Sequence, residues 1–216
     1  AIVLTHAHLD HSGYLPRIVK EGFSGTVYCT DATADLCEIL LKDSAHIAEK
    51  DAEDANRKGY SKHKPAMPLY TVKDAERALA LLQPVTFGAV TPLPGGASLK
   101  FRRAGHILGA ATAEISVADR KIVFSGDLGR YEDPFMWEPE PVANADYVVV
   151  ESTYGNRVHH DVDPTEALGA IIERTIARGG TVIIPAFAVG RAQLLLYHLW
   201  RLRAGGRLNS TPIYLD

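Results

Sequence analysis

The chain has few cysteines, no long apolar run and no marked excess of charge. Its 216 residues include two cysteines, Cys29 and Cys37, with seven residues between them. That spacing fits neither a disulfide framework nor a zinc knuckle, so we predict two reduced, buried thiols in a cytoplasmic protein. No apolar stretch approaches the roughly 20 residues that cross a bilayer, which predicts no membrane partner. The net charge of −3 argues against general coating of nucleic acid but leaves room for a local basic cleft.

The composition otherwise describes an ordinary globular protein, with 46% hydrophobic and 23% charged residues. The chain shows no signal peptide, and it begins at Ala1 rather than at a methionine. We therefore expect that it is an excerpt and that any targeting segment lies outside it.

The first part of the chain combines helical and strand patterns. Helical periodicity predicts helices over 32–57 and 71–83, the second stopped by Pro84. Short apolar segments separated by turn residues predict strands at 1–5, 25–30, 85–90, 97–105, 110–117 and 121–127. The nearly continuous apolar segment 146–153 is typical of a strand that is covered on both faces.

The pattern changes after residue 155. A helix is predicted over 164–178, a strand over 181–185, a helix over 189–204 and a strand over 212–216. Such alternation is typical of a parallel sheet with right-handed crossovers. We therefore expect an α/β protein with a boundary near 155–163, which separates a domain at 1–158 from an incomplete domain at 159–216.

Three histidines and an aspartate lie within six positions directly after the first predicted strand. They stand in the segment LTHAHLDHSG and are His6, His8, Asp10 and His11. Imidazole nitrogens and carboxylate oxygens are typical zinc ligands, and such groups would be costly to bury without partners. His6 and His8 can converge on one ion, and the two later residues can face a second. The alternative is a set of surface polar residues, or a helix N-cap with histidines beside it.

Two later residues extend this set. His106 lies in AGHILGA between two predicted strands, and Asp127 lies in FSGDLG at the end of another. Glycines beside both residues let the backbone approach closely. Either residue alone would be an ordinary loop histidine or turn aspartate, but both stand where strands end, as the first cluster does. The sequence therefore predicts one metal centre built from three segments.

These motifs resemble a known family. THAHLDHSG, AGHILGA and FSGDLG resemble successive motifs of the metallo-β-lactamase fold. ESTYGNR at 151–157 and IIPAFAVGRAQ at 183–193 resemble its β-CASP branch of RNA-processing nucleases, and the first is closer to the cleavage-and-polyadenylation nucleases than to the ribonuclease J group. The resemblance implies an αββα sandwich whose N-terminal strands are missing here, followed by the start of a Rossmann-like β-CASP domain.

The resemblance also implies a role for each site residue. The implied ligands are His6, His8 and His106 for one zinc, Asp10 and His11 for a second zinc, and Asp127 as a bridge between the two. Glu151 matches an acidic family position that handles protons or supports the ligands, and the alternative is a carboxylate that caps the loop at a strand end. A further family histidine lies downstream of this chain, which leaves the second zinc one protein ligand short.

Two zincs held in this way would supply the chemistry of phosphodiester hydrolysis. Metal binding lowers the pKa of water to roughly 7, so a bridging hydroxide is available to attack phosphorus while the metals neutralise the oxygens. No side-chain nucleophile is needed. The catalytic residues would then be Asp10, Asp127 and Glu151.

An RNA substrate must also be held by its phosphates. Arginine, lysine and helix N-termini are the usual phosphate contacts. The candidates are Lys100 and Arg102, on the strand that approaches the histidine loop, and Arg191 at the start of a predicted helix.

We therefore predict a zinc-dependent RNA phosphodiesterase that acts on single-stranded RNA. It would be an endoribonuclease, with 5′–3′ exoribonuclease action and homodimer formation left open. The alternative is a metallo-β-lactamase-fold hydrolase of a small ester or thioester, which would share every metal ligand. Residues 151–216 distinguish the two functions, because a hydrolase of small molecules needs no second domain over the cleft. A catalytically dead RNA-binding scaffold is a third reading, but it should have lost ligands that are present here.

Overall fold

The computed structural model describes residues 1–158, 162–208 and 210–215. The chain divides into two compact units, Ala1–Glu151 and Ser152–Asp216. The first three residues of the predicted second domain, 159–161, and the last residue of the predicted final strand lie outside the described residues. Among the helices that are described, none combines the length and apolar character needed to span a bilayer.

A small parallel sheet forms the centre of the first unit. Its strands are β1 (Ile2–Val3), β2 (Val27–Cys29) and β3 (Leu82–Pro84), hydrogen-bonded in that order. The strands predicted at 1–5 and 25–30 are confirmed, although both are shorter. The assignment of 82–83 to a helix was wrong, because these residues pair with β2, Leu82 opposite Val27. Here tertiary pairing prevails over a local helical pattern.

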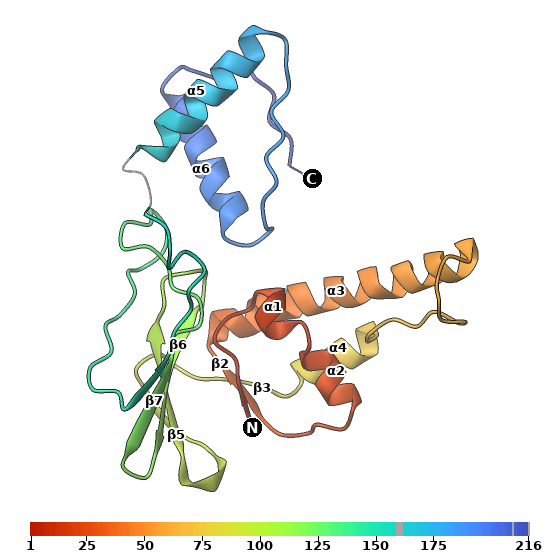
Figure 1. Cartoon of the computed structure of the whole chain (residues 1–216), viewed down its shortest axis with the longest axis vertical. Coiled ribbons are helices and arrows are strands. Elements are labelled where there is room, and N and C mark those ends of the chain that lie inside the picture. Colours follow the sequence, from red (N-terminus) through yellow and green to blue (C-terminus); the bar gives the residue numbers. More distant parts are fainter. Residues whose placement is uncertain (159–161, 209, 216) are drawn as a thin grey trace. The chain divides into compact units, whose positions relative to one another are not determined.

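Helices connect these strands and cover the sheet (Figure 1). They are α1 (Leu9–Ser12), α2 (Leu15–Lys20), α3 (Asp31–Lys58) and α4 (Val72–Leu79). The prediction of a long helix over 32–57 is confirmed. Thr30 caps its start by accepting a hydrogen bond from the backbone N–H of Thr33, and Gly59 ends it at a φ of 71°. The sequence did not predict α1 and α2.

The second sheet has five strands in chain order. They are β4 (Val90–Pro92), β5 (Ser98–Arg103), β6 (Ala111–Val117), β7 (Arg120–Phe124) and β8 (Tyr147–Val149), and the short 3-10 helix η1 (Pro94–Gly96) joins the first two. The first four strands are antiparallel neighbours, and three of them, β5, β6 and β7, confirm the predicted meander. Strand β8 joins β7 in parallel. The strand predicted at 85–90 was wrong except for its last residue, because pairing with β5 begins at Val90.

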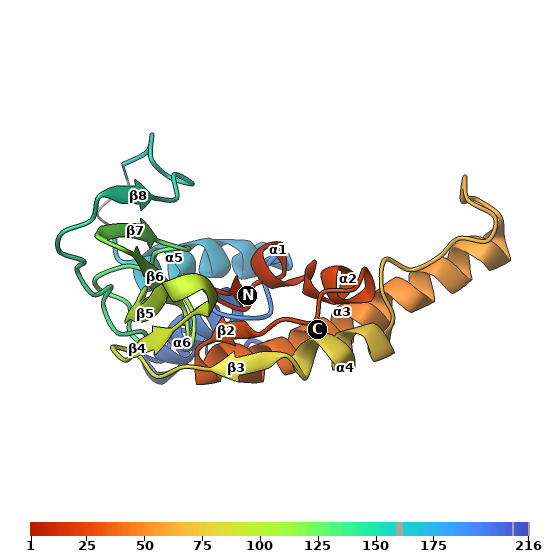
Figure 2. The same cartoon turned by 90° about the horizontal axis from the view of Figure 1, so that it is seen from below.

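Strand β2 lies between two apolar clusters because neighbouring side chains of a strand point to opposite faces. Val27 and Cys29 pack with helix residues such as Leu41, while Tyr28 packs with Leu99 and other residues of the second sheet. The first unit is thus layered as helices, a parallel sheet and a mostly antiparallel sheet, seen edge-on in Figure 2. This α/β arrangement agrees with a metallo-β-lactamase fold. The second helical layer of the expected αββα sandwich stays a prediction.

Strand β8 differs from its predicted environment. Tyr147, Val148 and Val149 are each more than half exposed, so the expectation of a strand covered on both faces was wrong for this chain. The strand lies at the edge of its sheet and pairs only with β7 within the described residues. An apolar sequence favours burial, but burial requires a neighbouring element.

The second unit is a pair of helices, α5 (Pro164–Ala177) and α6 (Arg191–Ala204). They pack through Ile172, Leu199 and Leu202, and the buried hydroxyl of Thr165 lies 2.9 Å from Nδ1 of His198. No strand forms in 152–158, 162–208 or 210–215, so the predictions of strands at 181–185 and 212–215 were wrong. An apolar extended segment becomes a strand only when another strand pairs with it.

Both cysteines are buried and unpaired, as predicted. Burial raises the pKa of the Cys29 thiol and of the Cys37 thiol to about 12. Both thiols are therefore protonated at neutral pH and serve as small apolar core groups.

Candidate metal centre

Three loops at strand ends bring four potential ligands together. His6 and His8 follow β1, His106 lies between β5 and β6, and Asp127 follows β7. Each offers one ligand atom, and all four atoms lie within 4.8 Å of one another. Residues from three distant parts of the sequence thus surround one point.

His6 is fully buried at this point. Its Nε2 has no hydrogen-bond partner within the described residues, and its Nδ1 lies 3.2 Å from the hydroxyl oxygen of Thr5. Burial, followed by the charges of His11, His106 and His8, lowers the pKa of His6 to about 3. The ring is therefore neutral at pH 7 and can offer a lone pair. An unsatisfied buried nitrogen is costly, and a bound cation would satisfy it.

The imidazoles of His8 and His106 are also close. Nδ1 of His8 lies 3.1 Å from Nε2 of His106, and the ring centroids are 4.9 Å apart. Burial lowers the pKa of His106, and the charge of His8 lowers it further against the opposing effect of Asp127. The two rings thus bring ring nitrogens toward a common centre.

The two oxygens of Asp127 face different histidines. Oδ2 lies 3.7 Å from Nε2 of His6 and 3.6 Å from Nε2 of His106. Oδ1 lies 3.3 Å from Nε2 of His11. The carboxylate therefore stands between two groups of nitrogen ligands.

His11 and Asp10 occupy the short helix α1 beside this carboxylate. Nε2 of His11 lies 3.5 Å from Oδ2 of Asp10, whose side chain is 78% exposed. The hydroxyl of Ser12 donates to the carbonyl oxygens of Ala7 and His8, at 2.8 and 3.1 Å, and so fixes the turn before the helix. Asp10 and His11 thus lie next to the four-residue cluster, but outside it.

Glycines let the His106 loop and the Asp127 loop touch. A Cβ on Gly129 would overlap the carbonyl group of Gly105 and lie 2.8 Å from the backbone nitrogen of His106. The backbone N–H of Gly129 donates to the carbonyl of Ala104 at 2.8 Å. The short distance between the two ligand loops therefore depends on the missing side chain at Gly129.

A pair of threonines holds the other end of the His106 loop, and sequence reasoning missed it. The hydroxyls of Thr30 and Thr33 both donate to the carbonyl oxygen of Gly109, at 2.7 and 3.1 Å. Both threonines are buried at the start of α3. The helix cap at Thr30 was detectable because a threonine directly before a helical pattern is a typical N-cap, but its contact 79 residues away along the chain was not.

Glu151 supports the loop that carries Asp127. Its Oε1 accepts the backbone N–H of Leu128 at 2.8 Å, and its own backbone N–H donates to the Ser125 hydroxyl at 3.1 Å. Glu151 also contributes to the electrostatic environment of His106. The structure thus brings this predicted residue next to the ligand loops.

The predicted RNA contacts lie on β5 and in the second unit. Arg102 on β5 pairs with the buried carboxylate of Glu114, which Lys121 also contacts at 3.2 Å. Lys100 lies on the same face of β5, directly opposite Glu114 in the neighbouring strand. Arg191 is the first residue of α6 in the second unit. Their contact with RNA stays a prediction.

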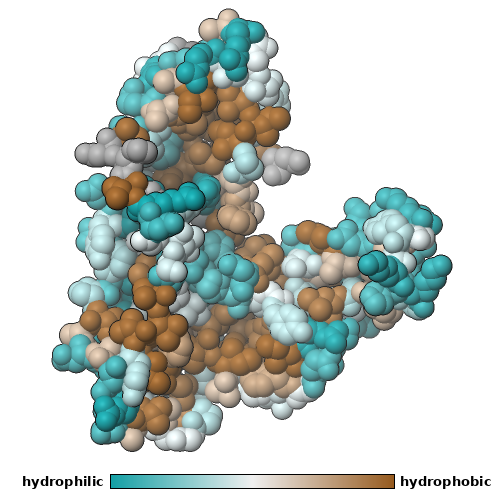
Figure 3. Space-filling model, viewed as in Figure 1, coloured by the Kyte–Doolittle hydropathy of each residue, from teal (hydrophilic) through white to brown (hydrophobic). Residues whose placement is uncertain are grey.

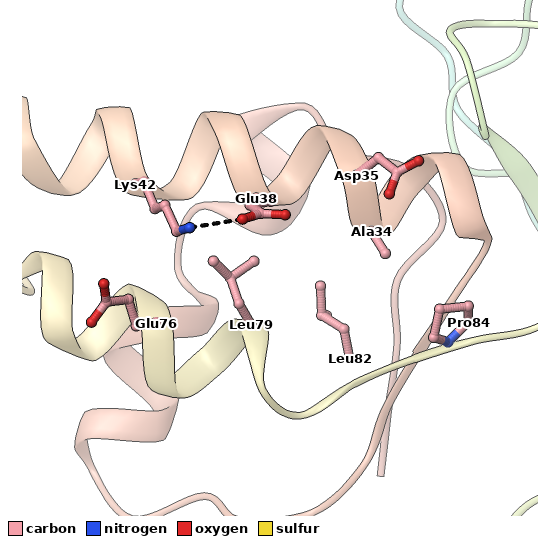
Figure 4. A pocket seen from close by; sticks show the side chains of 8 residues that line it. All are labelled: Ala34, Asp35, Glu38, Lys42, Glu76, Leu79, Leu82 and Pro84. Atoms are coloured by element: carbon pink, nitrogen blue, oxygen red, sulfur yellow. Dashed lines mark hydrogen bonds and ion pairs between the residues drawn. The ribbon is translucent and has the colours of Figure 1, made fainter.

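A separate surface groove lies between α3, α4 and β3 (Figure 4). Its lining side chains are Ala34, Asp35, Glu38, Lys42, Glu76, Leu79, Leu82 and Pro84. Lys42 donates a 2.8 Å hydrogen bond to Glu38. The groove contains no histidine, so it does not share the ligand chemistry of the loop cluster.

The loop cluster fits zinc. Zinc takes histidine nitrogens and carboxylate oxygens at 2.0–2.2 Å in a tetrahedron, whose edges are then about 3.3–3.6 Å. The separations of 3.1, 3.6 and 3.7 Å between ligand atoms are close to that edge length. The buried, unpartnered Nε2 of His6 is the atom that such an ion would satisfy.

Comparison with known proteins gives a consistent result. The chain matches the metallo-beta-lactamase superfamily over residues 1–184. It is 40% identical to Ribonuclease TTHA0252 of Thermus thermophilus, over all of this chain and 46% of the relative. It is 35% and 36% identical to Transcription termination factor FttA of Methanothermobacter thermautotrophicus and Methanococcus maripaludis, each over all of this chain and 33% of the relative.

The chain thus spans less than half the length of these curated relatives. The superfamily match includes every residue of the ligand cluster, and the matches to the relatives continue through the second unit to the last residue. The chain belongs to the metallo-beta-lactamase superfamily, and its whole length corresponds to part of the β-CASP ribonucleases.

Proposed function

We propose that this protein is a zinc-dependent RNA phosphodiesterase. It acts as an endoribonuclease on single-stranded RNA, and 5′–3′ exoribonuclease action is a further outcome to test. The observation that carries the proposal is the carboxylate of Asp127. One of its oxygens lies near His6 and His106, and the other lies near His11. A carboxylate between two groups of imidazoles is suited to bridge two cations.

The ligands divide accordingly. His6, His8 and His106 would hold one zinc, and Asp10 with His11 would hold a second, with Asp127 shared. When bound, the zinc pair lowers the pKa of a water ligand to about 7 and neutralises charge on the phosphate. The low pKa of His6 keeps its ring neutral, so that a nitrogen lone pair is available at working pH.

Glu151 has a positioning role in this proposal, beside its predicted part in proton handling. Its carboxylate holds the backbone of Leu128 and thereby the orientation of Asp127. The catalytic residues at the metals are then Asp10 and Asp127, with Glu151 as the positioning residue behind them.

We further propose that residues 1–158 form a partial metallo-β-lactamase-like domain and residues 159–216 the start of a Rossmann-like β-CASP domain. A ribonuclease among the relatives supports RNA as the substrate. The match through residue 216 favours this reading over a hydrolase of small esters or thioesters, which needs no second domain. Arg191, at the N-terminus of α6, and Lys100 and Arg102, on β5, are the proposed phosphate contacts.

The test is metal content together with RNA cleavage by the intact protein. We expect His8→Ala and Asp127→Ala to lower bound zinc, measured by mass spectrometry, and to abolish cleavage of single-stranded RNA. The matched control is His46→Ala, which removes an exposed histidine on α3 that is outside the cluster. Mapping the product ends distinguishes internal from 5′-terminal cleavage. Unchanged turnover in the two site variants would refute the proposed function.

A further inference from the structure

The far end of α3 and the loop after it carry a concentration of positive charge. Residues 57–64, RKGYSKHK, hold four lysines and arginines and no acidic residue, in a chain whose net charge is −3. We call this segment the basic tip. Figures 1 and 2 both show α3 extending away from the two sheets of its unit, with the basic tip at its end. Figure 3 shows a mostly hydrophilic surface there.

Part of this charge has a structural explanation. Arg57 and Lys58 both pair with Asp54, at 2.6 and 3.2 Å, in the last turn of α3, where cations also favour the helix dipole. Lys62 and Lys64 lie beyond the helix. Both are exposed, and neither forms an ion pair within the part of the chain that the structure describes. Their charges are free to meet an anionic partner.

An aromatic ring lies among these charges. Tyr60 is 65% exposed, between the two basic pairs of the tip. Proteins that bind single strands commonly combine cations that contact phosphates with exposed aromatic rings on which bases stack. A neighbouring apolar side chain, Met67, is 73% exposed and adds to the accessible surface.

The loop is held at its base. The side-chain amide of Asn56 donates to the carbonyl of Ala66 at 2.9 Å, and its oxygen accepts the backbone N–H of Ala66 at 2.7 Å. Gly59 closes the helix at a φ of 71°, where a side chain would be strained. These contacts hold the two ends of the loop together, which lowers the entropic cost of fixing it when a partner binds.

We propose that the basic tip is an accessory binding surface for single-stranded RNA. Lys62 and Lys64 contact phosphates, and Tyr60 stacks on a base. This inference rests on the proposed function, because that function supplies RNA as the partner. Helix α3 begins beside the hydrogen bonds that Thr30 and Thr33 donate to Gly109. Its 28 residues rise about 1.5 Å each, so the tip lies about 40 Å along the helix from these two threonines. The tip therefore binds RNA at a distance from the metal centre.

The first experiment measures binding to the intact, zinc-loaded protein. The probe is a fluorescent phosphorothioate-linked oligouridylate, which keeps the backbone charge and resists hydrolysis. Fluorescence anisotropy gives Kd across a salt series. We expect the double variant K62A/K64A to reduce the slope of log K against log salt by about 1.4, because each phosphate contact on a single strand contributes about 0.7.

The matched control is K50A/K73A, which removes two exposed lysines outside the tip and makes the same change in net charge. We expect its salt slope to equal that of the unmodified protein. A second variant, Tyr60→Ala, should weaken Kd at least fivefold without changing the salt slope, because stacking involves no counterion release. Thermal melting should be unchanged in all three variants, since every substituted side chain is exposed.

Three results would overturn the inference. The first is an unchanged salt slope in K62A/K64A, and the second is an equal reduction of the salt slope in both double variants. The third comes from the same anisotropy measurement with fluorescent polyglutamate: K62A/K64A would lose affinity for polyglutamate but not for the oligouridylate. The last result would assign the tip to an acidic protein partner instead. Failure of the proposed function has a different signature, because a protein that binds RNA through its tip but cleaves no RNA would refute the ribonuclease and leave the tip intact.

Discussion

Gly129→Ala tests whether backbone contact between two loops sets the geometry of the metal centre. The added Cβ would overlap the Gly105 carbonyl and stand 2.8 Å from the backbone nitrogen of His106, whereas ordinary contact begins at 3.4 Å. Relieving the contact with the His106 nitrogen alone requires 3.4 minus 2.8, or 0.6 Å, and the overlap with the Gly105 carbonyl requires the two loops to separate further than that. Metal–ligand distances vary by only about 0.2 Å. The variant should therefore misplace His106 relative to Asp127.

The expected effect is a 10- to 100-fold loss of zinc affinity, which corresponds to about 1.4–2.8 kcal/mol and matches the cost of removing groups that orient metal ligands. Competition against a chromogenic chelator measures it. The control is Gly205→Ala, whose Cβ would meet its nearest atom at 3.4 Å, an ordinary contact. Thermal melting of the metal-free proteins separates loss of affinity from loss of folding.

Wild-type zinc affinity in a folded Gly129→Ala protein would refute the reasoning. It would mean that the two loops are not held in their relative position by the contact between Gly105 and Gly129. A loss of the same size in the Gly205→Ala control would equally contradict it, because that variant leaves both ligand loops untouched.

Two further predictions concern the framework of the first unit. Replacing both Thr30 and Thr33 with valine leaves the Gly109 carbonyl without its donors, so zinc affinity measured by chelator competition should fall about tenfold. The control is Thr175→Val, which removes a hydroxyl bonded to Ile171 and should leave zinc affinity unchanged. Burial alone would raise the pKa of Asp74, but hydrogen bonds from Thr71 and Arg77 and the charge of Lys20 lower it from 3.8 to about 2. The stabilisation by ionised Asp74 is therefore full above pH 4 and is lost as pH falls toward 2. Urea unfolding should show the Asp74→Asn variant to be less stable by about 2 kcal/mol at pH 6, and the difference should shrink in acid. A difference that stayed constant with pH would contradict this prediction.

The sequence by itself identified the residues of the candidate site. His6, His8, His106 and Asp127 were recognisable because their side chains have metal-binding chemistry and each follows a predicted strand. Local signals also identified α3 and three strands of the meander, β5, β6 and β7, since helical periodicity, caps and turn residues act over a few neighbouring positions. These features depend on short-range interactions, which the sequence displays directly.

Other features depend on partners that are distant along the chain. Residues 82–84 form a strand because β2 lies beside them, while 181–185 form none because no described strand pairs with them, and local sequence is compatible with either outcome. The hydrogen bonds from Thr30 and Thr33 to Gly109 and the contact of Gly129 with Gly105 likewise join separate segments. The residue types of the candidate metal centre could thus be identified from the sequence. Only the tertiary structure decided which atoms meet, because hydrogen bonding and steric contact act between groups that are close in space wherever they lie in the chain.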